Sequence, residues 1–235
     1  MANLCTRFEQ STSQETQTEA QSGVTSESPT ALLVVDMQNA FCHPNGSFAR
    51  MLVGGEASIE MCQQAVPVCA RLIEGARVED IPVIFTRYVY QSGYADRDIL
   101  LQKYPDIERL SALEENSWDA QIVDDLEPRV GDFVIDKSRY SAFYGTRLEP
   151  LLDGLGVRHL VVCGVTTNVC VESTVRDASQ RHLKLFVVSD ATGELTRERH
   201  KNALDILEYG FAKVVEANEL LEAWRMECPH RKSDA

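Results

Sequence analysis

The sequence predicts an α/β fold, a three-layer doubly wound sheet of six mostly parallel strands with helices on both faces. Short runs rich in β-branched residues recur along the chain, and most are apolar throughout, as expected for strands buried on both faces. Helical patterns alternate with these runs, which is typical of parallel strands joined by helical crossovers. The expected strands are Leu32–Val35, Pro82–Thr86, Phe133–Ile135, Leu160–Cys163, Leu185–Val188 and Lys213–Val215.

Apolar stripes predict helices after the third, fourth and fifth strands. Leucines at helical spacing over 148–155 are followed by Gly156, a residue that favours the end of a helix. Val171, Val175 and Ala178 form a second stripe after the fourth strand. A third stripe over 203–207 precedes Gly210. Each of these helices links one strand to the next.

Length and composition predict one domain. The chain has 235 residues, of which 44% are hydrophobic and 25% charged. We expect residues 30–226 to form the domain, with a flexible polar tail over 1–29 and a shorter one over 227–235. The formal charge of −13 argues against nucleic acid or an anionic membrane as a partner. Seven cysteines without zinc-type spacing indicate reduced thiols, so we expect a cytoplasmic protein.

One cysteine stands where a helix is expected to begin. Cys170 lies within the run 164–173, between a predicted strand and a helical pattern. A thiol in the first turn of a helix faces unpaired backbone N–H groups and the positive end of the helix dipole, which favour the thiolate. This placement is typical of a nucleophile. The alternative is a buried cysteine that packs as a small hydrophobic residue.

Two charged residues follow other predicted strands. Asp36 comes directly after the first strand, and Lys137 comes shortly after the third. Ligands of open α/β sheets bind at the carboxyl ends of the strands, so we expect Asp36, Lys137 and Cys170 to converge there. Taken singly, Asp36 can be a helix or turn cap and Lys137 a surface charge. Together with Cys170 they favour a catalytic site.

These segments resemble the isochorismatase-like cysteine hydrolases, and the resemblance covers about residues 31–224. Its most specific parts are the runs 34–39, 137–143 and 167–174. The chain is most similar to the ureidoacrylate amidohydrolase branch, whose pattern over 117–124 it shares. The resemblance implies an Asp-Lys-Cys triad in which Cys170 attacks a carbonyl carbon, Asp36 is the general base and Lys137 balances the negative charges.

The resemblance also implies where the substrate binds. Backbone N–H groups of Thr166 and Cys170 form the oxyanion hole, with a cis peptide between Val165 and Thr166. Packing beside the site is the alternative role for each implied substrate-binding residue. For Arg139, an ion pair with an acidic residue is the alternative to binding a substrate carboxylate. The implied substrate-binding residues are Asn39, Phe41, Trp118, Arg139, Tyr140 and Phe143.

The main functional hypothesis is a cysteine amidohydrolase. It would cleave the C–N bond of a small linear amide, ureido or carbamoyl compound through a thioester and release ammonia. One alternative is an isochorismatase-type vinyl-ether hydrolase, but true isochorismatases lack the cysteine nucleophile, so Cys170 counts against it. Another is a non-catalytic binding or oligomerising protein on the same fold. Relatives are commonly dimers or tetramers, so a homodimer or homotetramer is expected.

We expect no cofactor and no catalytic metal. Nicotinamidase-type relatives carry an Asp-x-His metal site after the second strand, whereas this chain has Thr86-Arg87-Tyr88 there. Its five histidines lack the spacing of metal ligands. The long polar and aromatic segment Tyr88–Trp118 is a candidate lid or interface, or else a surface excursion packed by its own aromatic residues.

Overall fold

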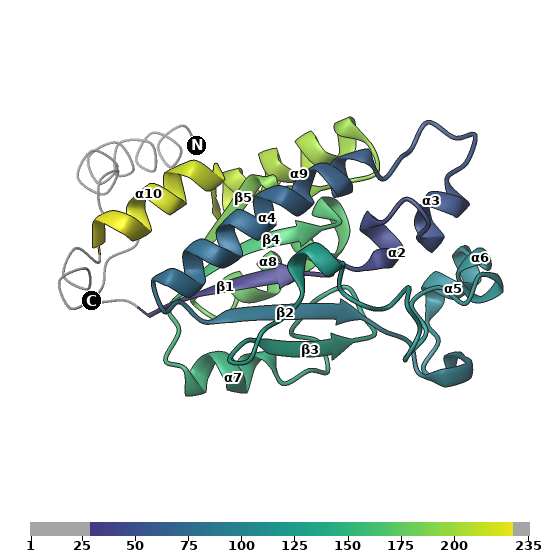
Figure 1. Ribbon diagram of the computed structural model, residues 1–235, viewed down its shortest axis with the longest axis horizontal. Coiled ribbons are helices and arrows are strands. Elements are labelled where there is room, and N and C mark those ends of the chain that lie inside the picture. The colour runs from purple at the N-terminus through teal and green to yellow at the C-terminus, as the bar shows by residue number, and fades with distance from the viewer. Residues whose placement is uncertain (1–28, 228–235) are drawn as a thin grey trace, which may run out of the picture.

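Six parallel strands form one sheet in the order β3-β2-β1-β4-β5-β6 (Figure 1). The computed structural model describes residues 29–227. The predicted tails, 1–29 and 227–235, lie outside this range except for their residues 29 and 227. Each predicted strand is present, and the α/β fold class is confirmed. The strands are β1 (Thr30–Val35), β2 (Val83–Tyr88), β3 (Phe133–Lys137), β4 (His159–Val165), β5 (Lys184–Gly193) and β6 (Lys213–Val215).

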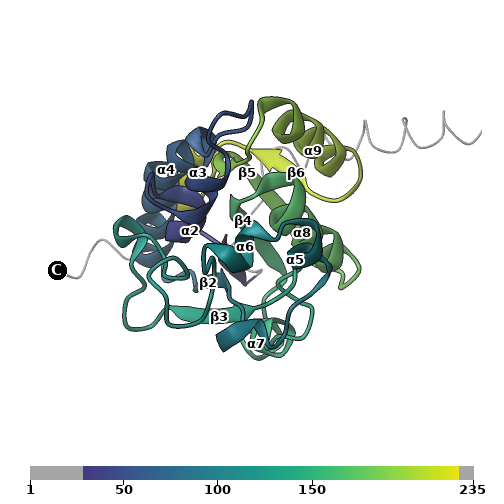
Figure 2. The ribbon, with the colours of Figure 1, turned by 90° about the vertical axis from the view of Figure 1, so that its right-hand side faces the viewer.

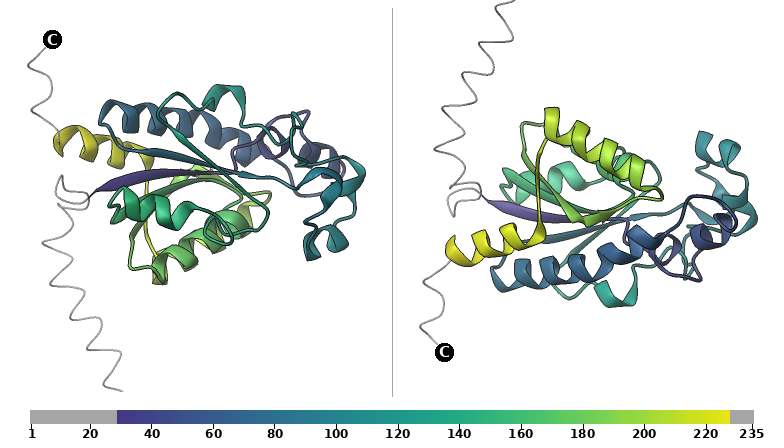
Figure 3. Two further views of the ribbon diagram at one scale, coloured as in Figure 1. Left: turned by 90° about the horizontal axis from the view of Figure 1, so that it is seen from below. Right: turned by 90° about the horizontal axis from the view of Figure 1, so that it is seen from above.

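Helices cover both faces of the sheet, as Figure 3 shows. On one face lie α4 (Glu60–Val78) and α10 (Ala217–Glu227), and on the other α7 (Leu148–Gly154), α8 (Glu172–Ser179) and α9 (Arg197–Gly210). The buried residues of α4 recur every three or four positions from Cys62 to Ala76, so one side of this helix packs on the sheet. The side chain of Thr196 begins α9 by accepting a hydrogen bond from the Arg199 N–H at 3.4 Å.

Shorter elements gather at the carboxyl edge of the sheet. Figure 2 looks onto this edge and shows α5 and α6 in front of the strand ends. The segment Tyr88–Trp118 therefore lies over that edge, and Tyr88, Tyr90 and Tyr94 are buried within it. The short elements are α2 (Asn39–Cys42), α3 (Ser47–Met51), α5 (Ile99–Lys103), α6 (Asp106–Arg109) and the turns η1 (Ser92–Tyr94), η2 (Asp124–Leu126) and η3 (Thr167–Val171).

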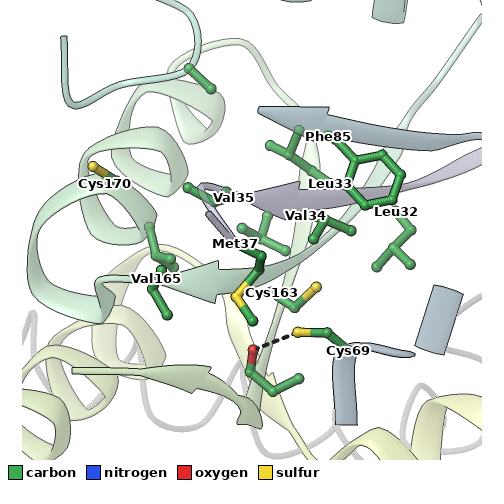
Figure 4. Close-up of a cluster of buried hydrophobic side chains, with 14 of the residues drawn as sticks. Leu32, Leu33, Val34, Val35, Met37, Cys69, Phe85, Cys163, Val165 and Cys170 are labelled. Carbon is green, nitrogen blue, oxygen red and sulfur yellow. Dashed lines mark hydrogen bonds between the residues drawn. The ribbon is translucent and has the colours of Figure 1, made fainter. Parts of the chain in front are cut away.

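The core lies between the sheet and its helices (Figure 4). Leu32 to Val35 are completely buried because β1 is a central strand with helices on both sides. The thiol of Cys69 donates to the Ala191 carbonyl oxygen at 3.3 Å. The five cysteines among the described residues are free thiols, as the sequence predicted for this part of the chain.

A glycine lets β4 approach β1 at the end that carries the charged residues. Gly164 has a φ of +112°, a backbone conformation that L side chains rarely adopt. A Cβ atom there would lie 2.1 Å from the Val35 carbonyl oxygen. In the sheet, β2 and β3 lie on one side of β1, whereas β4, β5 and β6 lie on its other side. α/β sheets bind ligands where the strand order reverses in this way, here between β1 and β4. The close approach therefore shapes the site itself.

Candidate active site

The three residues that the sequence singled out lie together at the carboxyl edge. Asp36 directly follows β1, Lys137 ends β3, and Cys170 lies in η3 after β4. The Lys137 ammonium donates to Asp36 Oδ2 at 2.6 Å, and both side chains are completely buried. The Cys170 side chain interacts with both the Asp36 carboxylate and the Lys137 ammonium. The arrangement brings a thiol, a base and a cation into one buried cluster.

A threonine that sequence reasoning did not assign to the site orients the acid. Thr86 Oγ1 donates to Asp36 Oδ1 at 2.7 Å, so each carboxylate oxygen has a partner. The Asp36 N–H donates in turn to the Thr86 carbonyl oxygen at 3.2 Å. Asp36 has a φ of 52°, which turns the chain sharply away from β1. The feature that could have indicated Thr86 as a site residue is its place near the carboxyl end of the strand next to β1.

Lys137 is a charged group held in the interior. Burial disfavours its ammonium, but the attraction of the Asp36 carboxylate outweighs burial and raises the pKa of Lys137. Its Nζ also donates to the Arg139 carbonyl oxygen at 3.1 Å and lies 4.6 Å from the centre of the Tyr88 ring. Lys137 is therefore not the surface charge that the sequence left open as an alternative.

Cys170 is a buried thiol on a helical turn. It lies in η3, a π-helical turn that continues into α8. Burial raises the pKa of Cys170; the Lys137 ammonium opposes this effect, and the Asp36 carboxylate adds to it. Burial therefore works against the thiolate that the sequence-based expectation favours, whereas the nearby ammonium works for it. The Asp36 carboxylate beside the thiol is placed to accept its proton.

The turn before Cys170 carries the other residues implied for the site. The peptide between Val165 and Thr166 is cis, as the resemblance implied. Thr166 and Cys170 both line one cavity of about 760 Å³ at the carboxyl edge of the sheet. Both residues therefore lie beside the same space.

A buried acid on this cavity was missed by sequence reasoning. Glu194 is 1% exposed, and it accepts hydrogen bonds from the backbone N–H groups of Asn168 at 3.3 Å and Leu195 at 2.9 Å. Burial raises the pKa of Glu194, while these N–H donors oppose the rise. Glu194 also binds the Thr166 side chain. It thereby ties the turn that carries Cys170 to the loop after β5. The sequence did not indicate Glu194, because the predicted strand ends at Val188 whereas β5 continues to Gly193.

Two of the six implied substrate-binding residues, Phe41 and Tyr140, line the cavity. Asn39 donates from Nδ2 to the Trp118 carbonyl oxygen at 2.9 Å, and the Trp118 ring packs edge-on against His43. Asn39 therefore orders the backbone beside the site, and Trp118 is 46% exposed.

The side chains of Arg139 and Phe143 contact residues that do not line the cavity. The Arg139 guanidinium donates to the carbonyl oxygens of Ser138 and Asp96, the latter at 3.2 Å. The Phe143 ring lies under the Arg181 guanidinium at 4.5 Å. Neither residue is among those that line the cavity. Nη1 of Arg139 thus has backbone acceptors, and the expected binding of a substrate carboxylate by this residue stays a prediction.

The described part of the chain also bears on metals and membranes. Within residues 29–227, no three His, Cys, Asp or Glu side chains gather in a way that could hold a metal ion. None of the helices in this range is long and apolar enough to cross a membrane.

Comparisons with known proteins agree with this architecture. The isochorismatase domain profile matches residues 30–219. A ureidoacrylate amidohydrolase RutB of Serratia proteamaculans is 38% identical over 179 residues, which are 69% of this chain and 69% of that protein. The RutB of Pantoea ananatis is 36% identical over 211 residues, covering 83% and 81%. A cysteine hydrolase structure from Pseudomonas syringae pv. phaseolicola superposes with a TM-score of 0.77 at 27% identity, covering 85% and 93%. The chain belongs to the isochorismatase family.

Proposed function

We propose that this protein is a cysteine amidohydrolase that cleaves the C–N bond of a small linear amide, ureido or carbamoyl compound. The observation that carries the proposal is Cys170 on the cavity wall, whose thiol interacts electrostatically with the completely buried pair of Asp36 and Lys137. The relatives named ureidoacrylate amidohydrolase support the same reaction class. In this proposal Asp36, Lys137 and Cys170 form the catalytic triad.

The first half of the reaction forms a thioester. Asp36 accepts the proton of the Cys170 thiol while the sulfur attacks the carbonyl carbon of the substrate. Backbone N–H groups of Thr166 and Cys170 donate to the oxygen that becomes negative. The protonated Asp36 then gives its proton to the leaving nitrogen, so the C–N bond breaks and ammonia departs. Lys137 balances the charge of whichever group is negative, the carboxylate or the thiolate.

The second half returns the enzyme to its starting state. Asp36 removes a proton from a water molecule, and the oxygen attacks the thioester carbon. The C–S bond breaks, and the thiolate takes the proton back from Asp36. The product leaves as a carboxylate or, from a ureido substrate, as a carbamate. The same carboxylate thus performs all four proton transfers, which is consistent with its central position between Thr86, Lys137 and Cys170.

Ammonia release over a panel of substrates tests the proposal. The panel contains ureido acids, carbamoyl amino acids and simple primary amides, each assayed with the wild type, Cys170→Ala and Cys69→Ala. Cys69 is the matched control because it is also a buried thiol but does not line the cavity. We expect activity in the wild type and in Cys69→Ala, and loss in Cys170→Ala. Hydroxylamine attacks the acyl-enzyme, so it should divert the product of a primary amide to a hydroxamate and that of a ureido compound to an N-hydroxyurea.

Retention of more than a few per cent of wild-type kcat by Cys170→Ala would contradict the proposal. So would hydrolysis of a primary amide without any hydroxamate, because a direct attack by water forms no acyl-enzyme.

A further inference from the structure

One wall of the Cys170 cavity is apolar over its whole extent. The residues that the segment 41–57 contributes to the lining are hydrophobic without exception. Two of them form an aromatic pair with ring centres 4.5 Å apart. We call this set the apolar wall; it consists of Phe41, Phe48, Met51, Leu52 and Ala57.

The cover over the strand ends adds a second apolar surface to the same cavity. Leu100 from α5, Ile107 from α6 and Leu113 after it all line the cavity. Figure 2 shows α5 and α6 in front of the carboxyl edge of the sheet. The cavity therefore has hydrophobic side chains on two sides that come from distant parts of the chain.

A buried carboxylate fixes these two surfaces to each other. Asp119 accepts the backbone N–H of Ser47 at 2.9 Å and its hydroxyl at 2.8 Å. The same carboxylate accepts the N–H of Leu113 at 3.0 Å. Ser47 begins α3, which carries part of the apolar wall, and Leu113 belongs to the cover. The apolar cavity is thus built into the folded protein before any ligand binds.

The size and polarity of the cavity do not match a very small polar substrate. About 760 Å³ is within the range of pockets that enclose drug-sized ligands. Glu194, one of the charged groups on the lining, already accepts two backbone N–H groups. Arg139 does not line the cavity, and its Nη1 donates to backbone carbonyl oxygens. Lys103, Asp106 and Arg199 also line the cavity, but most of the lining residues are aliphatic or aromatic.

We propose that the substrate carries an apolar substituent, an alkyl chain or aryl group, which lies against the apolar wall while its scissile carbonyl is at Cys170. This inference rests on the proposed function for the position of the carbonyl. Each methylene that enters the cavity should raise kcat/KM about fourfold, from the free energy of burying one methylene. Four added methylenes should therefore raise it by about two orders of magnitude.

A homologous series of primary amides, from acetamide to octanamide, measures this dependence through ammonia release. We expect kcat/KM to rise steeply with chain length until the cavity is full. The pair 4-methylpentanamide and succinamate has similar shape but opposite polarity, and we expect the neutral compound to be preferred. A kcat/KM that does not change with chain length, or a preference for succinamate, would overturn the inference. The proposed function would still stand if the hydrolysis depended on Cys170.

Alkylation of Cys170 tests the cavity without turnover. Iodoacetamide and N-hexyl iodoacetamide are compared by mass spectrometry of the Cys170 peptide, with glutathione as the reference for intrinsic reactivity. We expect the hexyl reagent to react faster at Cys170 relative to glutathione. Leu52→Asn should reduce this advantage, whereas Val53→Asn should not, because Leu52 lines the cavity and Val53 is 83% exposed.

The two assays separate the possible failures. An alkylation advantage for the hexyl reagent without ammonia from any amide would support the apolar site and refute the proposed function. Equal relative rates for the two reagents, unchanged by Leu52→Asn, would overturn the apolar site whatever the enzyme hydrolyses.

Discussion

Replacing Lys137 with Met removes one half of an ion pair that lies entirely inside the protein. Lys137 Nζ and Asp36 Oδ2 are 2.6 Å apart, and neither side chain has any exposed surface. Met has a similar length and no charge, so the variant leaves the Asp36 carboxylate with Thr86 but without its cation. Removing one partner of a buried pair costs about 3–5 kcal/mol, because the remaining charge is neither hydrated nor balanced.

The expected loss is large enough for routine measurement. For a domain of this length about 3–5 kcal/mol corresponds to a fall in Tm of roughly 6–20 °C. Urea unfolding of the wild type, Lys137→Met, Asp36→Asn and the double variant gives the coupling energy between the two residues. We expect the double variant to be more stable than Lys137→Met, since it contains no unbalanced carboxylate.

The pH dependence follows from the direction of the shift. Attraction by Asp36 outweighs burial and raises the pKa of Lys137 in the folded protein. The stabilisation is therefore complete below the ordinary lysine pKa of about 10.4 and is lost as the pH rises through the folded value. The stability difference between the wild type and Lys137→Met should stay constant up to about pH 10 and narrow above it. A loss below 1 kcal/mol at pH 7, or a double variant less stable than Lys137→Met, would refute this reasoning.

Burial raises the pKa of Cys170, so its thiolate fraction should still rise about tenfold per pH unit from pH 7 to 9. The rate of alkylation by iodoacetamide should rise with it, because the thiolate is the nucleophile. A plateau below pH 8 would show a thiolate that is already formed in the resting protein. Gly164→Ala should lower the free energy of unfolding by at least about 1–3 kcal/mol, because the added Cβ meets the backbone of β1 at a positive φ. Gly154→Ala, the control within α7, should raise it by about 0.5–1 kcal/mol in the same urea titration, since no atom lies within 4 Å of its new Cβ. Arg139→Lys should lower stability and leave the ratio of kcat/KM between carboxylate-bearing and neutral amides unchanged, because the guanidinium donates to backbone carbonyl oxygens. A loss confined to carboxylate substrates would place Arg139 in the substrate site.

Local patterns in the sequence were enough to predict the sheet and the strand ends near which Asp36, Lys137 and Cys170 lie. Strand formation depends on local runs of β-branched residues, and all parallel strands present their carboxyl ends at the same edge. Residues directly after such runs are therefore brought together whatever the details of packing. This is why three positions separated by as many as 134 residues, from 36 to 170, were identifiable without coordinates.

The directions of the side chains and the depth of their burial depend on tertiary packing, so they could not be predicted from the sequence. Thr86 and Glu194 join the site through hydrogen bonds to residues 50 and 26 positions away. Arg139 turns from the cavity to backbone oxygens, although it is two residues from Lys137. The pKa of Cys170 rises because distant segments exclude water from it. Local sequence sets the backbone periodicity, but burial and polarity at one point depend on every segment that packs there, so the cavity and its charges appear only in the folded chain.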